Sequence, residues 1–363
     1  MRTVGMIIGF IVFLFALAGY AGWHLWRMAP QGWKLAAVIL FVLWMASFFL
    51  GFAYVERLPL KAATILYEVG NTWLIAFMYL LIVFFLADLA SLCHLLPKAF
   101  LKDSPAGLLS VLGLVALILV LGGIHYHHKY REEITLTTTK PLEKPLTIVM
   151  ASDLHIGYHN GKAELGRWVD LVNAEQPDLV LIGGDLVDRS LRPILEGHFE
   201  EELRRIDAPT YAVLGNHEYF GDLERAERFF NDADIILLKD RVANDQGISI
   251  IGRDDRSNPQ RARLKELVQT AGCQDGFTLV LDHQPNHLEE AAEAGIDFQF
   301  SGHTHHGQVW PISWVTDLLF EKSWGHYRKG ATTYYISSGL GIWGAKIRVG
   351  TRSEYLVLHL INQ

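Results

Sequence analysis

Beyond residue 150, five short motifs carry residue types that can bind metal ions. They are Asp153-Leu154-His155, Gly184-Asp185-Leu186-Val187-Asp188-Arg189, Gly215-Asn216-His217-Glu218, Asp282-His283 and Gly302-His303-Thr304-His305. Hard divalent ions take oxygen ligands, whereas imidazole suits Mn, Fe and Zn. The mixture of carboxylate, amide and imidazole groups therefore predicts a site for Mn, Fe or Zn rather than a dedicated calcium site.

The spacing within two of these motifs also suits a shared site. Residues i and i+2 of an extended segment face the same way. Asp153 with His155, and His303 with His305, can therefore each present two ligands from one strand end. Glycines flank the motifs and let the backbone approach bound ions closely. Any one of these histidines alone would be an ordinary core or surface residue, so only the combination indicates a metal centre.

Each motif follows a short apolar run with the pattern of a buried strand. The five runs are Leu146–Ala151, Leu179–Ile182, Tyr211–Leu214, Thr278–Leu281 and Phe298–Phe300. A helical stretch, Ala163–Glu175, lies between the first two runs and carries apolar residues on one face. Strands that alternate with helices favour an α/β layered fold. In such sheets, sites lie at the carboxyl ends of the strands, where these motifs stand.

In this order, the motifs resemble those of the calcineurin-like metallophosphoesterase superfamily, over roughly residues 146–360. The resemblance implies a four-layer αββα sandwich with two divalent metal ions, Mn being favoured and Zn or Fe being alternatives. It also implies that metal-activated hydroxide attacks the phosphorus of a phosphate ester or pyrophosphate. Within the superfamily, the sequence is similar to the membrane-anchored YkuE-like bacterial branch, through Gly302–Gln308, Ser337–Gly341 and Ile347–Glu354.

The resemblance also assigns roles to individual positions. Seven side chains would hold the ions, in a first set, a second set and one bridging carboxylate: Asp153, His155 and His305; Asn216, His283 and His303; and Asp185. His217 follows the Asn ligand and would act as an acid near the leaving group without binding a metal. A histidine near its ordinary pKa suits that task.

Four further residues near the motifs have open interpretations. Arg189 could bind phosphate bidentately or be structural. His159 and His306 are the other candidates for substrate binding, and His306 stands where the branch usually has glycine. Asp188 could orient a ligand histidine or form an ordinary salt bridge.

Four segments before residue 126 are long and apolar enough to cross a bilayer, which takes about 20 residues. They are Val4–Trp26, Leu35–Val55, Trp73–Cys93 and Ala106–Ile124. Asp88 in the third segment is either a buried functional carboxylate or a residue near the headgroups. An even number of spans would place both ends of the chain on one side of the membrane. The basic residues of the loops do not decide which side that is.

A short polar stretch from Tyr126 to Pro145 follows the last span, with a β-prone segment at Ile134–Thr139. A linker of this length would keep the site close to the bilayer. Three tryptophans, Trp310, Trp324 and Trp343, follow the last ligand motif. They could line an apolar groove near the membrane, although core packing is the default interpretation.

Charge and cysteine content exclude some classes of protein. The chain has a net charge of −7, which divides into +4 for residues 1–130 and −11 for the remainder. The net negative charge of residues 131–363 argues against a nucleic acid partner. The only cysteines, Cys93 and Cys273, cannot form a disulfide framework or a cysteine-based zinc site.

Together these patterns predict a transmembrane domain at 1–126, a linker with the first strand at 127–145, and a catalytic domain at 146–363. The expected protein is a dinuclear-metal phosphoesterase of the bacterial inner membrane. It would act outside the cytoplasm on a phosphorylated, lipid-linked substrate. One alternative is a pyrophosphatase of the UDP-diacylglucosamine type from lipid A synthesis, which needs a cytosolic domain. Another is a non-catalytic membrane sensor, against which the intact ligand set argues.

Overall fold

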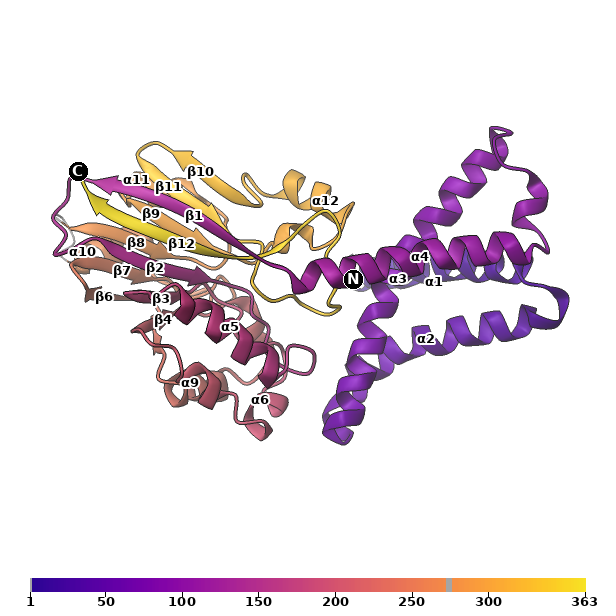
Figure 1. Cartoon of the computed structure of the whole chain (residues 1–363), viewed down its shortest axis with the longest axis horizontal. Helices are drawn as coiled ribbons and strands as arrows, with labels where there is room; N and C mark the ends of the chain where they lie inside the picture. Colours follow the sequence, from indigo (N-terminus) through magenta and orange to yellow (C-terminus); the bar gives the residue numbers. More distant parts are fainter. Residues whose placement is uncertain (1, 272–275) are drawn as a thin grey trace. The chain divides into compact units, whose positions relative to one another are not determined.

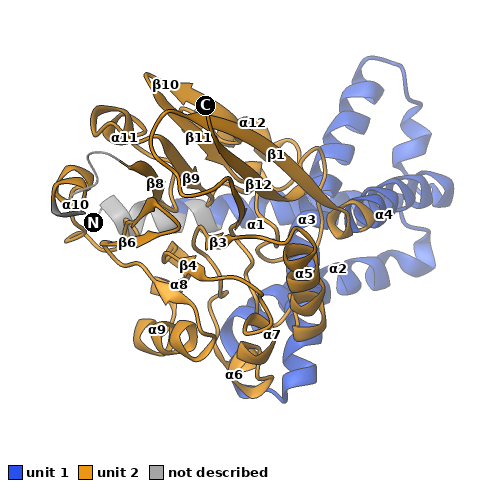
Figure 2. Ribbon diagram, turned by 60° about the vertical axis from the view of Figure 1, so that its left-hand side comes forward, with its two compact units in different colours: residues 1–123 blue, residues 124–363 orange. Residues whose placement is uncertain are grey.

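The computed structural model describes residues 2–271 and 276–363, except for the side chains of residues 2–8, 10, 11, 270 and 271. Cys273 lies outside the described residues. The chain divides into two compact units, Met1–Gly123 and Ile124–Gln363 (Figure 2). The second unit thus begins with the last turn of a helix that belongs mainly to the first.

The first unit is entirely helical. Its elements are α1 (Arg2–Met28), η1 (Gln31–Trp33), α2 (Lys34–Tyr54), η2 (Val55–Arg57), α3 (Leu60–Leu92), η3 (Lys98–Leu101) and α4 (Pro105–His127). Long apolar runs form helices because a helix satisfies its own backbone hydrogen bonds, which lipid cannot do. Among the described residues, three helical segments are long and apolar enough to span a membrane: Gln31–Arg57, Leu60–Leu92 and Pro105–His127.

The expected count of four spans is therefore not exact. Helix α1 stands where the first span, Val4–Trp26, was expected, but many of its side chains lie outside the described part. Asp88 on α3 is partly exposed and contacts two residues of α1. The hydroxyl of Tyr20 donates to the Asp88 carboxylate at 2.7 Å, and His24 Nε2 lies 2.9 Å from it. Asp88 is thus a partnered carboxylate between two helices.

The second unit is a sandwich of two mixed six-stranded sheets (Figure 1). The first sheet has the order β1-β12-β2-β3-β4-β5 and the second β10-β11-β9-β8-β7-β6. The strands are β1 (Lys129–Thr138), β2 (Leu146–Ala151), β3 (Leu179–Ile182), β4 (Thr210–Ala212), β5 (Ile236–Leu237), β6 (Arg241–Asp245), β7 (Ile248–Gly252), β8 (Phe277–Leu281), β9 (Phe298–Ser301), β10 (Gly325–Lys329), β11 (Thr332–Ile336) and β12 (Ser353–Asn362).

Helices cover both outer faces of the sandwich. Those on the faces are α5 (Lys162–Ala174), α6 (Arg192–Glu196), α7 (Glu200–Leu203), α9 (Leu223–Asp232), α10 (Leu264–Ala271) and α11 (Glu289–Glu293). The remaining helices of this unit are α8 (Asn216–Phe220), the short η4 (His305–Gly307) and α12 (Ile312–Leu319). Side chains alternate across each strand, so Ile148 of β2 packs between the sheets and Val149 packs under the outer helices. A third core joins β7 and β8 to α10 and α11. The expected four-layer αββα sandwich is confirmed.

The sheet topology fixes where the chain enters the sandwich. β12 runs antiparallel to β2 and parallel to β1, while β3 and β4 run parallel to β2. The beginning of β1 therefore lies at the same edge of the sheet as the carboxyl ends of β2, β3 and β4. Only His128 separates β1 from the end of α4. The last turn of α4 thus meets the sheet at the edge where the sequence places its metal motifs.

Candidate metal centre

The motifs come together at the carboxyl ends of strands from both sheets. Three overlapping groups form there, each with donor atoms that all lie within 4.8 Å of one another: Asp153, His155 and His305; His155, Asp185 and His217; and Asp185, His283 and His303. Most of these side chains are buried. A buried cluster of this composition has the donor set of a dinuclear Mn, Fe or Zn site.

The distances between donor atoms of the cluster test whether these residues fit metal ions. His155 Nε2 lies 3.0 Å from His305 Nε2. His283 Nε2 lies 3.2 Å from a carboxylate oxygen of Asp185, yet the two make no hydrogen bond. Donors about 2.1 Å from one ion lie about 3 Å apart when their bonds are at right angles. These spacings therefore fit atoms that converge on shared ions rather than on each other.

Asp185 lies at the centre of the cluster. The same oxygen, Oδ2, is 3.2 Å from His283 Nε2 and 3.6 Å from His155 Nε2, which belong to different groups. The other oxygen accepts a hydrogen bond from the backbone N–H of His217 at 2.9 Å. Burial opposes the charged carboxylate, but the neighbouring imidazoles outweigh that effect and lower the pKa of Asp185. This position between the two histidines is the one that a bridging ligand needs.

The seventh expected ligand, Asn216, contacts His303 of the cluster. Its side-chain oxygen lies 2.7 Å from His303 Nδ1. Asn216 begins the short helix α8, and Val213, Leu214 and Gly215 separate it from the end of β4. The structure therefore brings all seven expected metal ligands to one place.

Five of these seven ligands have left-handed backbone conformations. The φ values are +55° for Asp153, +44° for His155, +50° for Asp185, +71° for His303 and +48° for His305. Such a conformation costs of order 1–3 kcal/mol per residue other than glycine and clusters at functional sites. The strain turns the side chains out of the strand direction and into the common site.

Two glycines are needed for the carboxylates to fit. A Cβ atom on Gly215 would lie 2.1 Å from Asp185 Oδ1, and one on Gly302 would lie 2.2 Å from Asp153 Oδ2. Both distances are far below van der Waals contact. Any larger residue at either position would displace a carboxylate from the cluster.

His217 lies at the edge of the cluster and is held by Asp188. Its Nδ1 lies 3.0 Å from Asp188 Oδ1. A buried carboxylate can only accept, so Nδ1 carries a proton and Nε2 is left for substrate. Burial favours the neutral ring, but the hydrogen bond to Asp188 and the nearby carboxylates outweigh it and raise the pKa of His217. Of the two interpretations of Asp188, the geometry supports orientation of a histidine.

Comparison with known proteins agrees with this geometry. The profile of the calcineurin-like phosphoesterase family matches residues 146–307. The metallophosphoesterase YkoQ of Bacillus subtilis is 31% identical over 233 residues, which cover 59% of this chain and 83% of that protein. The chain belongs to the calcineurin-like metallophosphoesterase family. It carries a metallophosphoesterase domain after helices that are long and apolar enough to cross a membrane.

Two other relatives show how far the likeness extends. A metallophosphoesterase of Helicobacter pylori strain J99 is 33% identical over 225 residues, which are 61% of each chain. A Bos taurus transmembrane protein with a metallophosphoesterase domain is 29% identical over 249 residues, 63% of this chain and 56% of that one. The chain thus spans less than two thirds of the length of both relatives. The YkuE-like branch and the identity of the metal stay predictions.

Three residues of this metallophosphoesterase support the ligands without belonging to any expected ligand set. The Glu218 carboxylate accepts from the backbone N–H groups of Val187 and Gly215, so it ties two ligand loops together. The buried Arg348 donates to the carbonyl oxygen of His305 at 2.7 Å. The amide of Asn160 donates to the carbonyl oxygen of His155 at 3.1 Å. These contacts hold backbone rather than side chains.

The three substrate-binding candidates lie in different surroundings. Arg189 is exposed beside the cluster. His159 is buried, with Nε2 2.6 Å from the carbonyl oxygen of Ile342, which leaves it little surface for a substrate. His306 stacks on Trp324 with ring centres 5.0 Å apart and faces Asp317 at 3.5 Å. Their roles in substrate binding remain predictions.

Apolar rings surround the mouth of the site. His217 contacts the rings of Phe220 and Trp343, with centres 5.2 Å and 6.5 Å away. His303 contacts Phe320 at 6.1 Å. Phe220 and Trp343 are exposed, so core packing is the wrong interpretation for Trp343. The rim thus offers apolar surface to a substrate.

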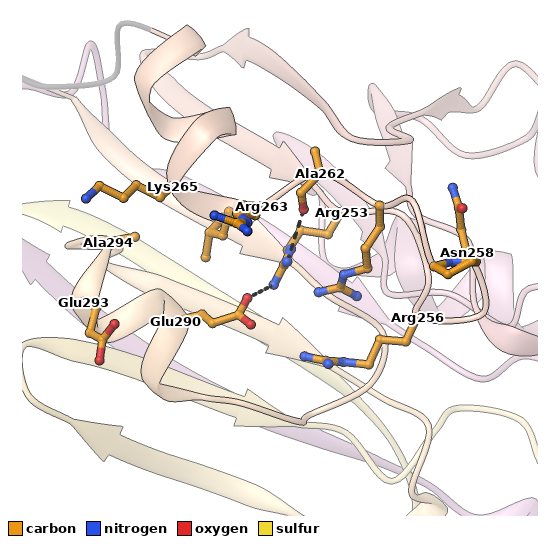
Figure 3. A pocket seen from close by; sticks show the side chains of 12 residues that line it. Arg253, Arg256, Asn258, Ala262, Arg263, Lys265, Glu290, Glu293 and Ala294 are labelled. Carbon is orange, nitrogen blue, oxygen red and sulfur yellow. Dashed lines mark hydrogen bonds and ion pairs between the residues drawn. The ribbon is translucent and has the colours of Figure 1, made fainter.

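A basic hollow of 570 Å³ lies between α10 and α11, beyond the carboxyl end of β7 (Figure 3). Arg253 and Arg261 on its wall both donate to the carboxylate of Asp282, the residue before His283. Arg253 also donates to Glu290, as Figure 3 shows. Much of the basic charge is therefore used to hold the strand end that carries a metal ligand.

Proposed function

We propose that this metallophosphoesterase uses two metal ions, Mn being favoured, to hydrolyse a phosphate ester or pyrophosphate of a lipid-linked substrate. Asp153, His155 and His305 would hold one ion, and Asn216, His283 and His303 the other. Asp185 would bridge them. The substrate's phosphoryl group would lie over the ions, and its apolar part would lie against the rim of the site.

The position of the last turn of α4 is the observation that supports a lipid-linked substrate. The last turn of α4 meets the sheet at the edge that bears the ligands, as the pairing of β1, β12 and β2 requires. Tyr126, in that turn, hydrogen bonds to Asn160, which in turn holds the backbone of His155. The end of a membrane helix is therefore two hydrogen bonds from a metal ligand. A site held beside a membrane helix in this way would suit a substrate that is itself held in the bilayer.

Divalent ions in such a site would polarise the phosphoryl oxygens and supply a solvent nucleophile near neutral pH. The chain itself supplies the proton for the leaving oxygen. His217 holds that proton on Nε2, because Asp188 fixes the ring through Nδ1 and stabilises the charged form. Arg189, which follows Asp188 in the chain, would pair with a free phosphate oxygen. The exposed rings of Phe220 and Trp343 would keep bulk water from the leaving group.

Activity of the purified full-length chain tests the proposal. The protein should be stripped of metal, reloaded separately with Mn, Fe and Zn, and assayed on a soluble aryl phosphodiester, a phosphomonoester and a lipid pyrophosphate. We expect turnover that depends on the added metal and is lost in Asp185→Asn. No turnover of any of these esters by the metal-loaded wild type would refute the proposal.

We further propose that the chain lies in a bacterial inner membrane with its sandwich outside the cytoplasm. The support is the resemblance to an exported branch of the family. A C-terminal alkaline phosphatase reporter should then be active in intact cells. An inactive phosphatase fusion combined with a fluorescent cytosolic reporter would instead favour a nucleotide-lipid pyrophosphatase.

A further inference from the structure

Helix α12 exposes most of its apolar side chains, which is unusual for a protein surface in water. Its apolar residues are exposed, with fractions of 61% for Trp314, 86% for Leu318 and 73% for Leu319. Its small polar residue Ser313 is buried instead. Scattered apolar residues are normal on a surface, but a contiguous exposed patch marks an interaction site. The face formed by Trp314, Val315, Leu318 and Leu319, here called the α12 face, is such a patch.

The α12 face lies close to the end of the last membrane helix. His125, in the last turn of α4, has its Nε2 2.9 Å from the carbonyl oxygen of Thr351. The hydroxyl of Thr351 donates to the carbonyl oxygen of Gln308. The backbone N–H of Trp310, just before α12, donates to the carbonyl oxygen of Val349 at 2.7 Å. One short segment, 349–351, therefore joins the end of α4 to the start of α12.

A cleft beside the segment 349–351 also shows that the end of α4 lies close to the residues just before α12. It measures 230 Å³ and is lined by His125 and Tyr130 on one side and by His306 and Trp324 on the other. α12 also follows directly on η4, the turn that carries the ligand His305. The apolar face, the end of the membrane helix and the metal centre are thus neighbours within one compact unit.

Lipid is the partner that fits this surface. Tryptophans favour the boundary between lipid and water, and Trp310 packs edge-on against Trp314 with ring centres 5.4 Å apart. A helix that lies in the interface buries one apolar face among the headgroups. A bilayer that held α4 would end near the last turn of that helix, and the segment 349–351 joins this turn to the start of α12. A soluble protein partner would have to compete with that bilayer for the same face.

We propose that the α12 face inserts into the bilayer beside the end of α4 and holds the mouth of the metal centre among the lipid headgroups. This deepens the proposed function, on which it rests for its biological meaning. A lipid-borne phosphoester would then reach the metals without leaving the membrane. Phe220 and Trp343, two exposed rings that contact His217, add apolar surface at the mouth of the site.

Fluorescent labelling of the full-length chain tests the insertion without any assay of activity. In a Cys93→Ser/Cys273→Ser background, Leu318→Cys would carry an environment-sensitive dye in nanodiscs of equimolar phosphatidylethanolamine and phosphatidylglycerol. Ile236→Cys on β5 is the matched control, because Ile236 is also an exposed apolar residue. We expect the dye at 318 to be blue-shifted, quenched by nitroxide-bearing lipids and shielded from iodide. The dye at 236 should be open to iodide and unaffected by the nitroxide lipids.

Two results would overturn the proposal. One is a dye at 318 that iodide reaches as readily as the dye at 236. The other is a dye shielded from iodide but not quenched by nitroxide lipids, in particles that contain two chains, which would mean that a second copy covers the face.

A double substitution links the face to catalysis. Leu318→Asp/Leu319→Asp places charges in the interface, so kcat/KM for a lipid-borne phosphoester should fall at least about tenfold, and turnover of a soluble aryl phosphodiester should stay within about twofold. Ile236→Asp should change neither. Equal loss on both esters, or loss on neither, would contradict the proposal. If the wild type cleaves no ester at all, the proposed function fails, while the dye measurement still decides the insertion.

Discussion

The hydroxyl of Tyr126 lies 2.9 Å from the side-chain oxygen of Asn160. Tyr126 is in the last turn of α4, and Asn160 donates to the carbonyl oxygens of Leu154 and His155 at 2.9 and 3.1 Å. Both side chains are completely buried. The helix that leaves the membrane is thus built into the loop that presents the first two metal ligands, and is not a detached tether.

Removing this hydroxyl should loosen the ligand loop. Tyr126→Phe removes a buried hydroxyl that lies 2.9 Å from both Asn160 Oδ1 and Glu164 Oε1. Losing such a buried donor costs about 1–3 kcal/mol. We expect a lower unfolding temperature of the detergent-solubilised chain and weaker metal retention on dialysis. Tyr130→Phe, the same change four residues later, is the matched control. An unchanged unfolding temperature for Tyr126→Phe would mean that the contact does not stabilise the loop.

Replacing the central carboxylate should affect both metals. Asp185→Asn removes the one oxygen that lies near histidines of both groups. We expect activity to be abolished and the metal content per chain to fall, as measured by elemental analysis. Asp170→Asn, on the outer helix α5, serves as the control and should keep the wild-type content. If Asp185→Asn still binds two ions per chain, the bridging assignment is wrong.

His217 should contribute to turnover and not to metal binding. His217→Ala removes the ring that Asp188 orients, so kcat for an ester with a poor leaving group should fall by about 10²–10⁴. For an ester whose leaving group needs no proton, kcat should fall much less. The metal content should equal that of the wild type. Metal loss in this variant would instead identify His217 as a ligand.

The pH profile should report the contact between His217 and Asp188. The hydrogen bond and charge of Asp188 help to raise the pKa of His217, so Asp188→Asn should lower that pKa. The acid form of His217 would then be lost at lower pH. We expect the alkaline limb of the kcat profile to move toward acid while the metals stay bound. A limb that moves toward higher pH, or does not move, would exclude His217 as the acid.

Local patterns were enough to predict the strands that precede the ligand motifs. β2 and β3 have the bounds that their apolar runs predicted, because strands buried on both faces read as continuous apolar runs. α5 differs from its predicted range by one residue at each end. Asp153, Asp185 and Asn216 lie within four residues of the ends of β2, β3 and β4, so the sheet edge brings them together.

The supporting contacts could not be predicted in this way. Asn160 donates to the carbonyl oxygen of Ile342, 182 residues away, and Arg348 to that of His305, 43 residues away. Nothing in their local sequence indicates burial. Arginine is rarely buried completely, so residue type alone gives no reason to expect the buried position of Arg348. The outward face of α12 was missed for the opposite reason, since a run such as Ile312–Leu319 normally packs inward. The unusual feature of α12 is which of its faces is buried, and only the tertiary structure shows that.

The central claim is that the metal centre acts on lipids of its own bilayer. The most direct test reconstitutes the full-length, metal-loaded chain in vesicles and supplies a lipid-borne phosphoester either in the same bilayer or in separate vesicles. A soluble aryl phosphodiester, assayed in both samples, controls for the amount of active enzyme. We predict that the lipid ester is cleaved at least about tenfold faster in the enzyme's own bilayer, because proximity replaces a bimolecular encounter. Equal rates in the two arrangements would contradict the account, since a site that faces away from its membrane would serve both alike.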